Sequence, residues 1–398
     1  MKDATIKLVT LIILIALSGC SNYNILQSTS TASKTEKIPS SPQSEYSSTN
    51  QITTIDYDTG KLTLFGSTPV KIKKIGVLLP LDESFKDISV AIRDGLISAW
   101  YENSVQEYRP QLFFFSTSSP LSNTIERIKR EKIDFVIGPL RKMMIPRVEN
   151  LLPSGVGMLA LNTTLPSYVE TPGYYQFALA PEDEAIQVAK KARIAGDRML
   201  LIVPKTEWGD RMSQAYKNIW EELNGSIASE ISFNPKTSNY SELVKESLNI
   251  EGSYSRRRLL KNLIGMKIEF DARRREDIDV ILLAANGIQA RQILPQLRFH
   301  KAENVPIFSS SHVYSDFHSN ANNKDLEGLT FGDAPWVTGE ENYFLRKTLK
   351  DTAHPANDYP RLFAFGRDAY SILPFLKKME NYPYIRIPGA TGNLWLDS

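Results

Sequence analysis

Cysteine is almost absent from this chain of 398 residues, which contains Cys20 alone. A single cysteine excludes an intramolecular disulfide, so the fold must be stabilised by its core, and 42% of the residues are hydrophobic. Histidine is also scarce: none of the four has a metal-ligand spacing, and neither a Gly-x-Ser-x-Gly elbow nor a phosphate-binding glycine loop occurs. The sequence therefore predicts no enzyme, no metal site and no cofactor.

Strong net charge and long apolar runs are missing too. The formal charge is only +2, which does not favour a nucleic-acid partner. Beyond the N-terminus, no apolar run approaches the roughly 18 residues that a transmembrane helix needs. The bulk of the chain is therefore predicted to be globular.

The N-terminus has the features of an export signal. Lys2 and Lys7 precede an apolar run over residues 8–17, which at roughly ten residues is short for a membrane-spanning anchor, the alternative interpretation. The run 17–20, Leu-Ser-Gly-Cys, resembles the lipobox of bacterial lipoprotein precursors. That resemblance implies a signal peptide at residues 1–19, lipid on Cys20 and a membrane-anchored protein facing the periplasm. By the same resemblance, Ser21 in place of Asp implies the outer membrane.

Residues 20–70 differ in composition from the rest of the chain. They are rich in Ser and Thr and have no period, which predicts a disordered tether. Alternating apolar residues between 52 and 65 leave open a short hairpin or docking strand. A flexible tether of about 50 residues has a root-mean-square span of roughly 40 Å, enough to let a domain move away from the membrane.

From residue 71 onward, strand and helix patterns alternate, which predicts an α/β fold with parallel sheets. The predicted strands are 75–79, 112–115, 135–139, 158–161, 175–179, 199–203, 227–233, 280–283 and 305–309. The predicted helices lie around 88–100, 125–128, 145–152, 181–196 (opened by Pro181 and closed by Gly196), 210–223 and 287–297. Two series of similar size predict two lobes, 71–180 and 181–335, with 336–398 as a returning segment. A single sheet of about ten strands is the alternative.

Four short motifs resemble those of type I periplasmic binding proteins. They are residues 74–81 at the first strand, 136–139 at the third, 208–210 at the entry to the second lobe, and the Thr-Gly turn at 389–394. The resemblance implies a two-lobed fold for 71–398, with each lobe Rossmann-like.

Five further motifs resemble a narrower family. They are residues 273–279, 289–295, 310–314, 326–329 and 333–336, in that order. Together they resemble the C-terminal domain of the LppC/LpoA family of lipoproteins that activate penicillin-binding proteins. The implied function is to bind and stimulate a class A penicillin-binding protein and so regulate peptidoglycan synthesis. The alternatives are a lipoprotein that binds or senses a small polar, amino-acid-like solute, and a structural scaffold.

Two departures from that family stand out. Its best-known members carry a helical-repeat domain before this one, and here the predicted tether occupies that place. The globular domain would then reach a partner at the inner membrane through a disordered segment instead of a rigid rod. The chain also ends at residues 396–398, within what the resemblance makes a final strand or turn, and a truncated reading frame would explain this.

Polar residues after the predicted strands form a candidate ligand cleft, because ligands of such folds bind outside the carboxyl ends of the strands. The candidates are Thr117, Ser118, Asn162, Thr163, Trp208, Ser311, His312 and Tyr314. A Ser–His catalytic pair at 310–312 is the disfavoured interpretation of the last group. Type I binders usually carry a hydroxyl soon after Gly-Pro in the third loop, but Leu140, Arg141 and Lys142 follow Gly138-Pro139 here. This weakens the prediction of an amino-acid ligand.

A basic segment is the second candidate site. Arg256, Arg257, Arg258 and Lys261 alternate with Leu259, Leu260, Leu263 and Ile264 at helical spacing, which predicts an inserted amphipathic helix. It is predicted to dock on an acidic partner surface or on anionic glycan. The alternative is a solvated helix flank, with Arg273, Arg274 and Arg275 tied to carboxylates such as Glu276 and Asp277.

Overall fold

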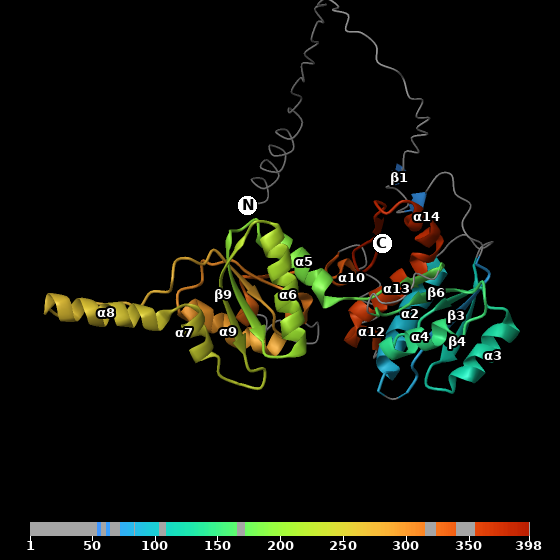
Figure 1. Ribbon diagram of the computed structural model, residues 1–398, viewed down its shortest axis with the longest axis horizontal. Helices are drawn as coiled ribbons and strands as arrows, with labels where there is room; N and C mark the ends of the chain where they lie inside the picture. Colours follow the sequence, from blue (N-terminus) through green and yellow to red (C-terminus); the bar gives the residue numbers. More distant parts are fainter. Residues whose placement is uncertain are drawn as a thin grey trace, which may run out of the picture. The chain divides into compact units, whose positions relative to one another are not determined.

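The structure is a computed structural model that describes residues 54–56, 61–63, 72–82, 84–102, 109–164, 172–314, 324–339 and 355–397. It divides the chain into two units, Met1–Gly66 and Ser67–Ser398, each described by itself (Figure 1). In the first unit β1 (Thr54–Asp56) pairs antiparallel with β2 (Lys61–Thr63), so the hairpin alternative is confirmed. The signal peptide, the lipid site at Cys20 and most of the predicted tether lie outside the described residues.

The second unit contains two parallel sheets, and the first is built on β3 (Lys74–Leu79), a strand that is apolar after its first residue. The strands are β3 (Lys74–Leu79), β4 (Gln111–Ser116), β5 (Phe135–Ile137), β6 (Gly157–Ala160) and β7 (Tyr174–Gln176), in the order β4-β3-β5-β6-β7. The helices that follow them are α2 (Lys86–Glu102), α3 (Leu121–Glu131), η2 (Lys142–Met144) and α4 (Ile145–Glu149). Residues 75–79 of β3 are all buried, as expected when helices cover both faces of a parallel sheet.

The second sheet repeats this arrangement. Its strands are β8 (Arg198–Pro204), β9 (Ser226–Phe233), β10 (Val280–Leu283), β11 (Ile307–Ser309) and β12 (Leu329–Phe331), in the order β9-β8-β10-β11-β12. Its helices are α5 (Pro181–Ala192), α6 (Glu207–Glu222), α7 (Ser241–Ser247), α8 (Ile250–Ile264), α9 (Gly287–Phe299) and η3 (Ser311–Val313). Both sheets have the doubly wound order 2-1-3-4-5, so the predicted α/β class with parallel sheets is confirmed.

The chain then returns to the first sheet. Its last elements are α10 (Pro335–Thr338), α12 (Pro355–Asp358), α13 (Pro360–Ser371), η5 (Leu373–Phe375), α14 (Leu376–Asn381), β13 (Ile387–Pro388) and β14 (Asn393–Leu394). Phe365 and Ala369 of α13 share one hydrophobic core with Val77 of β3 and Ile92 of α2. No helix in the described part of the chain is both long enough and apolar enough to cross a membrane.

The Thr-Gly turn near the C-terminus is held by a buried carboxylate. Asp368 accepts hydrogen bonds from the backbone nitrogens of Ala390 and Thr391, both at 2.7 Å, and from the Thr391 hydroxyl at 2.6 Å. Burial raises the pKa of Asp368, and these three donors partly offset that rise. The motif at 389–394 therefore ties the end of the chain to α13.

Several helix ends differ from the predictions. The helix that begins at Pro181 ends at Ala192, not at Gly196. Gly196 has a different role, because a Cβ there would lie 2.3 Å from the Cβ of Asp279. The next helix begins at Glu207, three residues earlier than predicted, because the Thr206 hydroxyl accepts a hydrogen bond from the nitrogen of Gly209 at 3.0 Å.

Two other helices also depart from the predicted bounds. α4 ends at Glu149, so Leu151 and Leu152 lie beyond it. α9 continues through Pro295 and ends at Phe299. The Asn286–Gln289 capping box stabilises the start of this helix, and its apolar face packs in the core on both sides of the proline. Helix ends depend on caps and packing, which apolar spacing alone does not report.

Candidate functional site

The first four cleft candidates lie at the carboxyl ends of strands in the first sheet. Thr117 and Ser118 follow β4, and Asn162 and Thr163 follow β6. The Asn162 side chain donates to the carbonyl oxygen of Leu140 at 3.0 Å and accepts from the nitrogen of Thr163 at 2.9 Å. Asn162 therefore braces the loops at this edge with its own hydrogen bonds.

An ion pair occupies the neighbouring loops at the same edge. Arg141, after β5, pairs with Asp82, after β3, and its guanidinium lies over the Phe85 ring at 4.5 Å. The Ser118 hydroxyl donates to the same carboxylate at 2.9 Å. The Asp82 carboxylate is thus engaged by both Arg141 and the Ser118 hydroxyl.

The other four cleft candidates gather at the corresponding edge of the second sheet. The Trp208 and His312 rings lie 4.9 Å apart, and Tyr314 stacks on Phe331 at 5.2 Å. The Ser311 hydroxyl donates to Glu184 at 3.0 Å. Burial lowers the pKa of His312, with a smaller contribution from Arg361, so its imidazole favours the neutral form.

The eight candidates thus form two groups, one at each sheet. Neither of the two cavities described in the structure is lined by any of them. His312 contacts the Ser310 hydroxyl at 3.2 Å, but Ser310 is fully buried, so it presents no exposed nucleophile. Among the described residues, no three metal-ligating side chains come together.

Arg361 joins the returning segment to the second sheet, a role that no sequence pattern indicated. Its guanidinium binds Asp333 through two hydrogen bonds, of 2.7 and 2.5 Å, and donates to the carbonyl oxygens of Ser311 at 3.1 Å and Tyr314 at 3.2 Å. The Asp333 side chain is fully buried. Asp333 precedes α10 and Arg361 lies in α13, so one side chain fixes the loop after β11 against two separate parts of the chain.

Asp279 shows how a family motif can serve the fold. It ends the run 273–279, and its carboxylate accepts hydrogen bonds from the Arg198 side chain at 2.7 and 3.0 Å and from the Arg198 nitrogen at 2.9 Å. The Arg198 guanidinium lowers the pKa of Asp279 to about 2. The carboxylate thus stays ionised and ties the entry to β10 to the start of β8.

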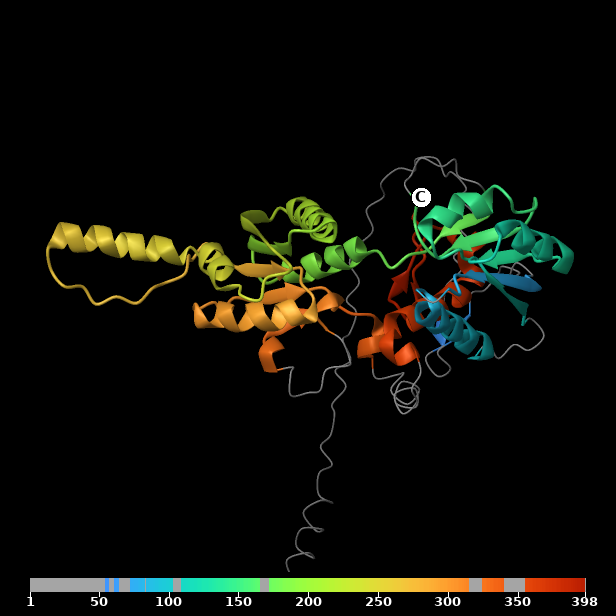
Figure 2. The same ribbon diagram turned by 90° about the horizontal axis from the view of Figure 1, so that it is seen from below.

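The basic segment forms a projection that we call the α8 arm, made of α8 and residues 265–272. Figures 1 and 2 show α8 extending away from the second sheet, with its return segment beside it. Only Ile250 and Ser253, near the base of the helix, are buried. The exposed fractions along the rest of the arm are 63% for Leu259, 49% for Leu260, 82% for Leu263, 55% for Ile264 and 68% for Met266.

The basic residues of the arm differ in what they contact. Arg258 pairs with Glu251 at 2.8 Å, and the Arg257 guanidinium lies over the Phe270 ring at 5.0 Å. Arg256 and Lys261 have no ion-pair or ring partner among the described residues. Arg275 pairs with Asp277 at 2.6 Å, as the solvated-flank alternative expected, and lies outside the helix.

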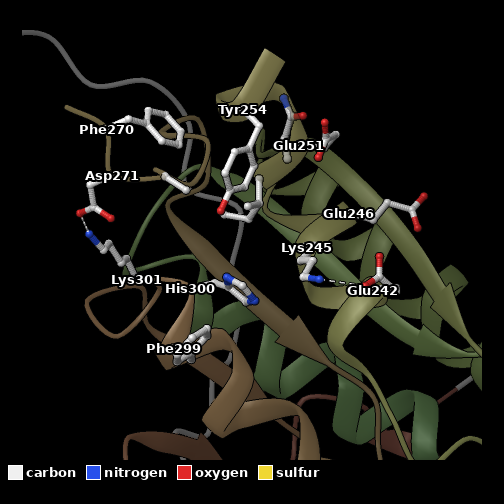
Figure 3. Close-up of a pocket in the computed structure, with 13 residues that line it drawn as sticks. Glu242, Lys245, Glu246, Glu251, Tyr254, Phe270, Asp271, Phe299, His300 and Lys301 are labelled. Atoms are coloured by element: carbon white, nitrogen blue, oxygen red, sulfur yellow. Dashed lines mark hydrogen bonds and ion pairs between the residues drawn. The ribbon is translucent and has the colours of Figure 1, made fainter. Parts of the chain in front are cut away.

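A groove of about 760 Å³ lies at the base of the arm, where no sequence signal pointed (Figure 3). It is lined by Glu242, Lys245, Glu246, Asn249, Ile250, Glu251, Tyr254, Phe270, Asp271, Ala272, Phe299, His300 and Lys301. Glu242 pairs with Lys245, and Asp271 with Lys301. Burial lowers the pKa of His300. Polar groups here are largely paired, while the exposed rings of Tyr254 and Phe299 remain at the rim.

The chain matches a family of known proteins. A family model described as "LppC putative lipoprotein" matches residues 57–398. A protein of Photobacterium profundum named penicillin-binding protein activator LpoA is 28% identical over 337 residues, covering 82% of this chain and 54% of that protein. A relative of the same name from Aliivibrio fischeri is 29% identical over 340 residues. The chain thus spans about half the length of these curated relatives.

Solved structures show the same fold. The C-domain of LpoA from Haemophilus influenzae, described as a regulator of PBP1A, superimposes with a TM-score of 0.62 at 21% identity, covering 82% of this chain and 93% of that domain. A Chromobacterium violaceum protein described as a "putative branched-chain amino acid ABC transporter" gives 0.59 at 22% identity. The two-lobed, periplasmic-binding-protein-like fold and the family resemblance are both confirmed. The chain belongs to the LppC family.

Proposed function

We propose that this protein binds and stimulates a class A penicillin-binding protein and thereby promotes peptidoglycan synthesis. One observation carries the proposal: relatives named penicillin-binding protein activators match 82% of this chain. The region they share is the folded unit, and its counterpart of known structure is described as a regulator. We propose further that lipid on Cys20 anchors the protein to the outer membrane, facing the periplasm.

The proposed role is allosteric and not catalytic. An activator can shift a synthase toward its active state only by binding that state more tightly than the inactive one. The second unit suits this role, because the polar groups at its sheet edges are used to brace loops, as in the Arg141–Asp82 pair and the Arg361–Asp333 pair. Such bracing fixes the loops that surround the sheet edges.

The test is glycan polymerisation and crosslinking by the organism's class A penicillin-binding proteins, with and without unlipidated protein beginning at Ser21. We expect a several-fold rise in rate that saturates with protein concentration. Saturation matters because it separates specific binding from a crowding effect. No rise, together with no binding to any class A synthase in a pull-down, would rule out the proposal.

A second candidate function is capture of a small polar solute. Three buried polar atoms near the strand ends, Asp82 Oδ1, Thr117 Oγ1 and Trp208 Nε1, find no hydrogen-bond partner among the described residues, and a ligand would satisfy such atoms. The Arg141–Asp82–Ser118 contacts oppose it, because they already engage the Ser118 hydroxyl and one oxygen of the Asp82 carboxylate.

We therefore expect free amino acids to leave the thermal unfolding midpoint unchanged. A true ligand at 100 times its dissociation constant would add about 2.7 kcal/mol to the free energy of unfolding, which a thermal-shift screen detects easily. The Arg141→Ser variant places a hydroxyl after Gly138-Pro139, where type I binders usually carry one, and its unfolding midpoint is measured with the same amino acids for comparison. A clear shift of the unsubstituted protein by one amino acid would establish solute capture instead.

A further inference from the structure

Among the described residues, none covers the apolar side chains of the α8 arm. Four side chains of this helix, Leu259, Leu260, Leu263 and Ile264, are 49 to 82% exposed, although a helix of a globular protein normally buries its apolar stripe. The helix is 15 residues long, about 22 Å at its standard rise, and the four exposed side chains lie in its last six residues. An exposed aliphatic row of this size indicates a surface that another molecule covers.

Another part of the helix surface is already in contact with the chain. The Tyr254 and Phe270 rings lie 5.2 Å apart, and Arg257 lies over the same Phe270 ring. The Ser253 hydroxyl accepts from the nitrogen of Arg273 at 3.1 Å. The return segment and Arg273 thus contact Ser253, Tyr254 and Arg257, while Leu259, Leu260 and Leu263 remain 49 to 82% exposed.

Arg256 belongs to the leucine row. Arg256, Leu259, Leu260 and Leu263 have the spacing i, i+3, i+4 and i+7, which places them on one face of a helix. This is the anchor pattern of a helix that binds in an apolar groove of a partner. Arg256 has no ion-pair partner among the described residues, so its guanidinium is available to a carboxylate of the other molecule.

The composition of this face selects the kind of partner. Glycan offers hydroxyls but no apolar surface, so binding glycan would not remove the aliphatic side chains from water. A helix in a membrane interface presents free cations on the face away from the apolar one. Of the cations on that face of α8, Arg257 and Arg258 are engaged by Phe270 and Glu251, and Arg256 lies within the leucine row. A protein groove accommodates both, since an apolar floor covers the leucines and a carboxylate at the rim binds the guanidinium through two hydrogen bonds.

We propose that the α8 arm inserts its Arg256–Leu259–Leu260–Leu263 face into an apolar groove, rimmed by a carboxylate, on the synthase that the protein activates. This inference rests on the proposed function and names the contact through which it acts. Arg257 and Arg258 support the arm through Phe270 and Glu251, so Arg256 and the leucines form the contact itself.

The test compares binding and activation for the unsubstituted protein, a Leu259→Gln/Leu263→Gln variant, Arg256→Glu and Arg256→Lys. Because these side chains are exposed, all variants should keep the unsubstituted unfolding midpoint. We expect the double variant and Arg256→Glu each to weaken affinity for the synthase about tenfold or more, and Arg256→Lys to weaken it less. Ile194→Gln, at a site 81% exposed, and Arg130→Glu, on α3, are the matched controls and should stay within about twofold.

Direct contact is tested with a photoreactive phenylalanine analogue at position 263, which should crosslink to the synthase, while the same analogue at position 194 should not. Normal affinity and activation by the α8 variants overturn this inference and leave the proposed function standing. If the unsubstituted protein binds no class A synthase, both are overturned. If the leucine variant loses binding to phosphatidylethanolamine–phosphatidylglycerol vesicles but keeps its affinity for the synthase, the arm contacts a membrane and the inference is wrong.

Discussion

Replacing Arg361 by Ala is expected to lower the free energy of unfolding by about 3 kcal/mol. The side chain is 30% exposed, but its partner Asp333 is fully buried, and the substitution leaves that carboxylate without its cation. Removing one member of a buried ion pair costs more than the pair itself contributes, because an uncompensated charge remains in the interior. The carbonyl oxygens of Ser311 and Tyr314 lose a donor at the same time. Urea unfolding, followed by tryptophan fluorescence, measures the change.

Two variants separate the charge of Arg361 from its geometry. Arg361→Lys keeps the cation but loses the two parallel hydrogen bonds to Asp333, so we expect a loss of about 1 kcal/mol. Arg130→Ala is the control, because Arg130 is mostly exposed and only 3.5 Å from its sequence neighbour Glu131, and it should change stability by less than about 0.5 kcal/mol. An Arg361→Ala variant as stable as this control would contradict the bracing role.

Replacing Gly366 by Ala is expected to destabilise the protein by about 3 kcal/mol, although alanine favours a helix over glycine by about 1 kcal/mol. Gly366 of α13 faces α2, and a Cβ there would lie 2.0 Å from the carbonyl oxygen of Ile92. Gly95 of α2 meets α13 in the same way, with its Cβ position 1.9 Å from the carbonyl oxygen of Phe363. Backbone atoms on both sides cannot move aside singly, so the helices must separate and open the core around Phe365.

Gly252→Ala is the matched control for this prediction. It also places a methyl group in a helix, α8, but the atoms nearest to the methyl belong to the side-chain amide of Asn249, which can rotate away. We expect a change between zero and a gain of about 1 kcal/mol, from helix propensity. The prediction is tested by measuring the thermal unfolding midpoints of Gly366→Ala and Gly252→Ala under the same conditions. Equal midpoints would show that α2 and α13 tolerate separation.

The strands were the most predictable part of the fold. Residues 75–79 and 280–283 are unbroken apolar runs, and in the structure both are buried strands in the middle of parallel sheets. Such runs are predictable because a strand covered on both faces has no polar position to interrupt it. Helix ends were less predictable. The cap at Thr206 and the close approach of Gly196 to Asp279 depend on hydrogen bonds and on neighbours distant in sequence.

The candidate sites divide in the same way. Polar residues such as Thr117 and Ser311 were expected at strand ends, and strand ends are where they lie. Their partners could not be predicted, since Asp82 meets Arg141 and Asp333 meets Arg361 only after folding. The groove at the base of the arm was missed for the same reason, because it is assembled from α7, α8, α9 and the return segment.

By itself the sequence determined the alternation of strands and helices, the two sheets and the family, because these follow from apolar patterns and motifs that are local in the chain. It also placed Arg256 and the leucines at helical spacing. Only the tertiary structure decided which of these side chains are covered. Burial and charge pairing depend on residues far apart in sequence, and these leave the leucine face of α8 exposed while Arg257 and Arg258 are engaged within the arm.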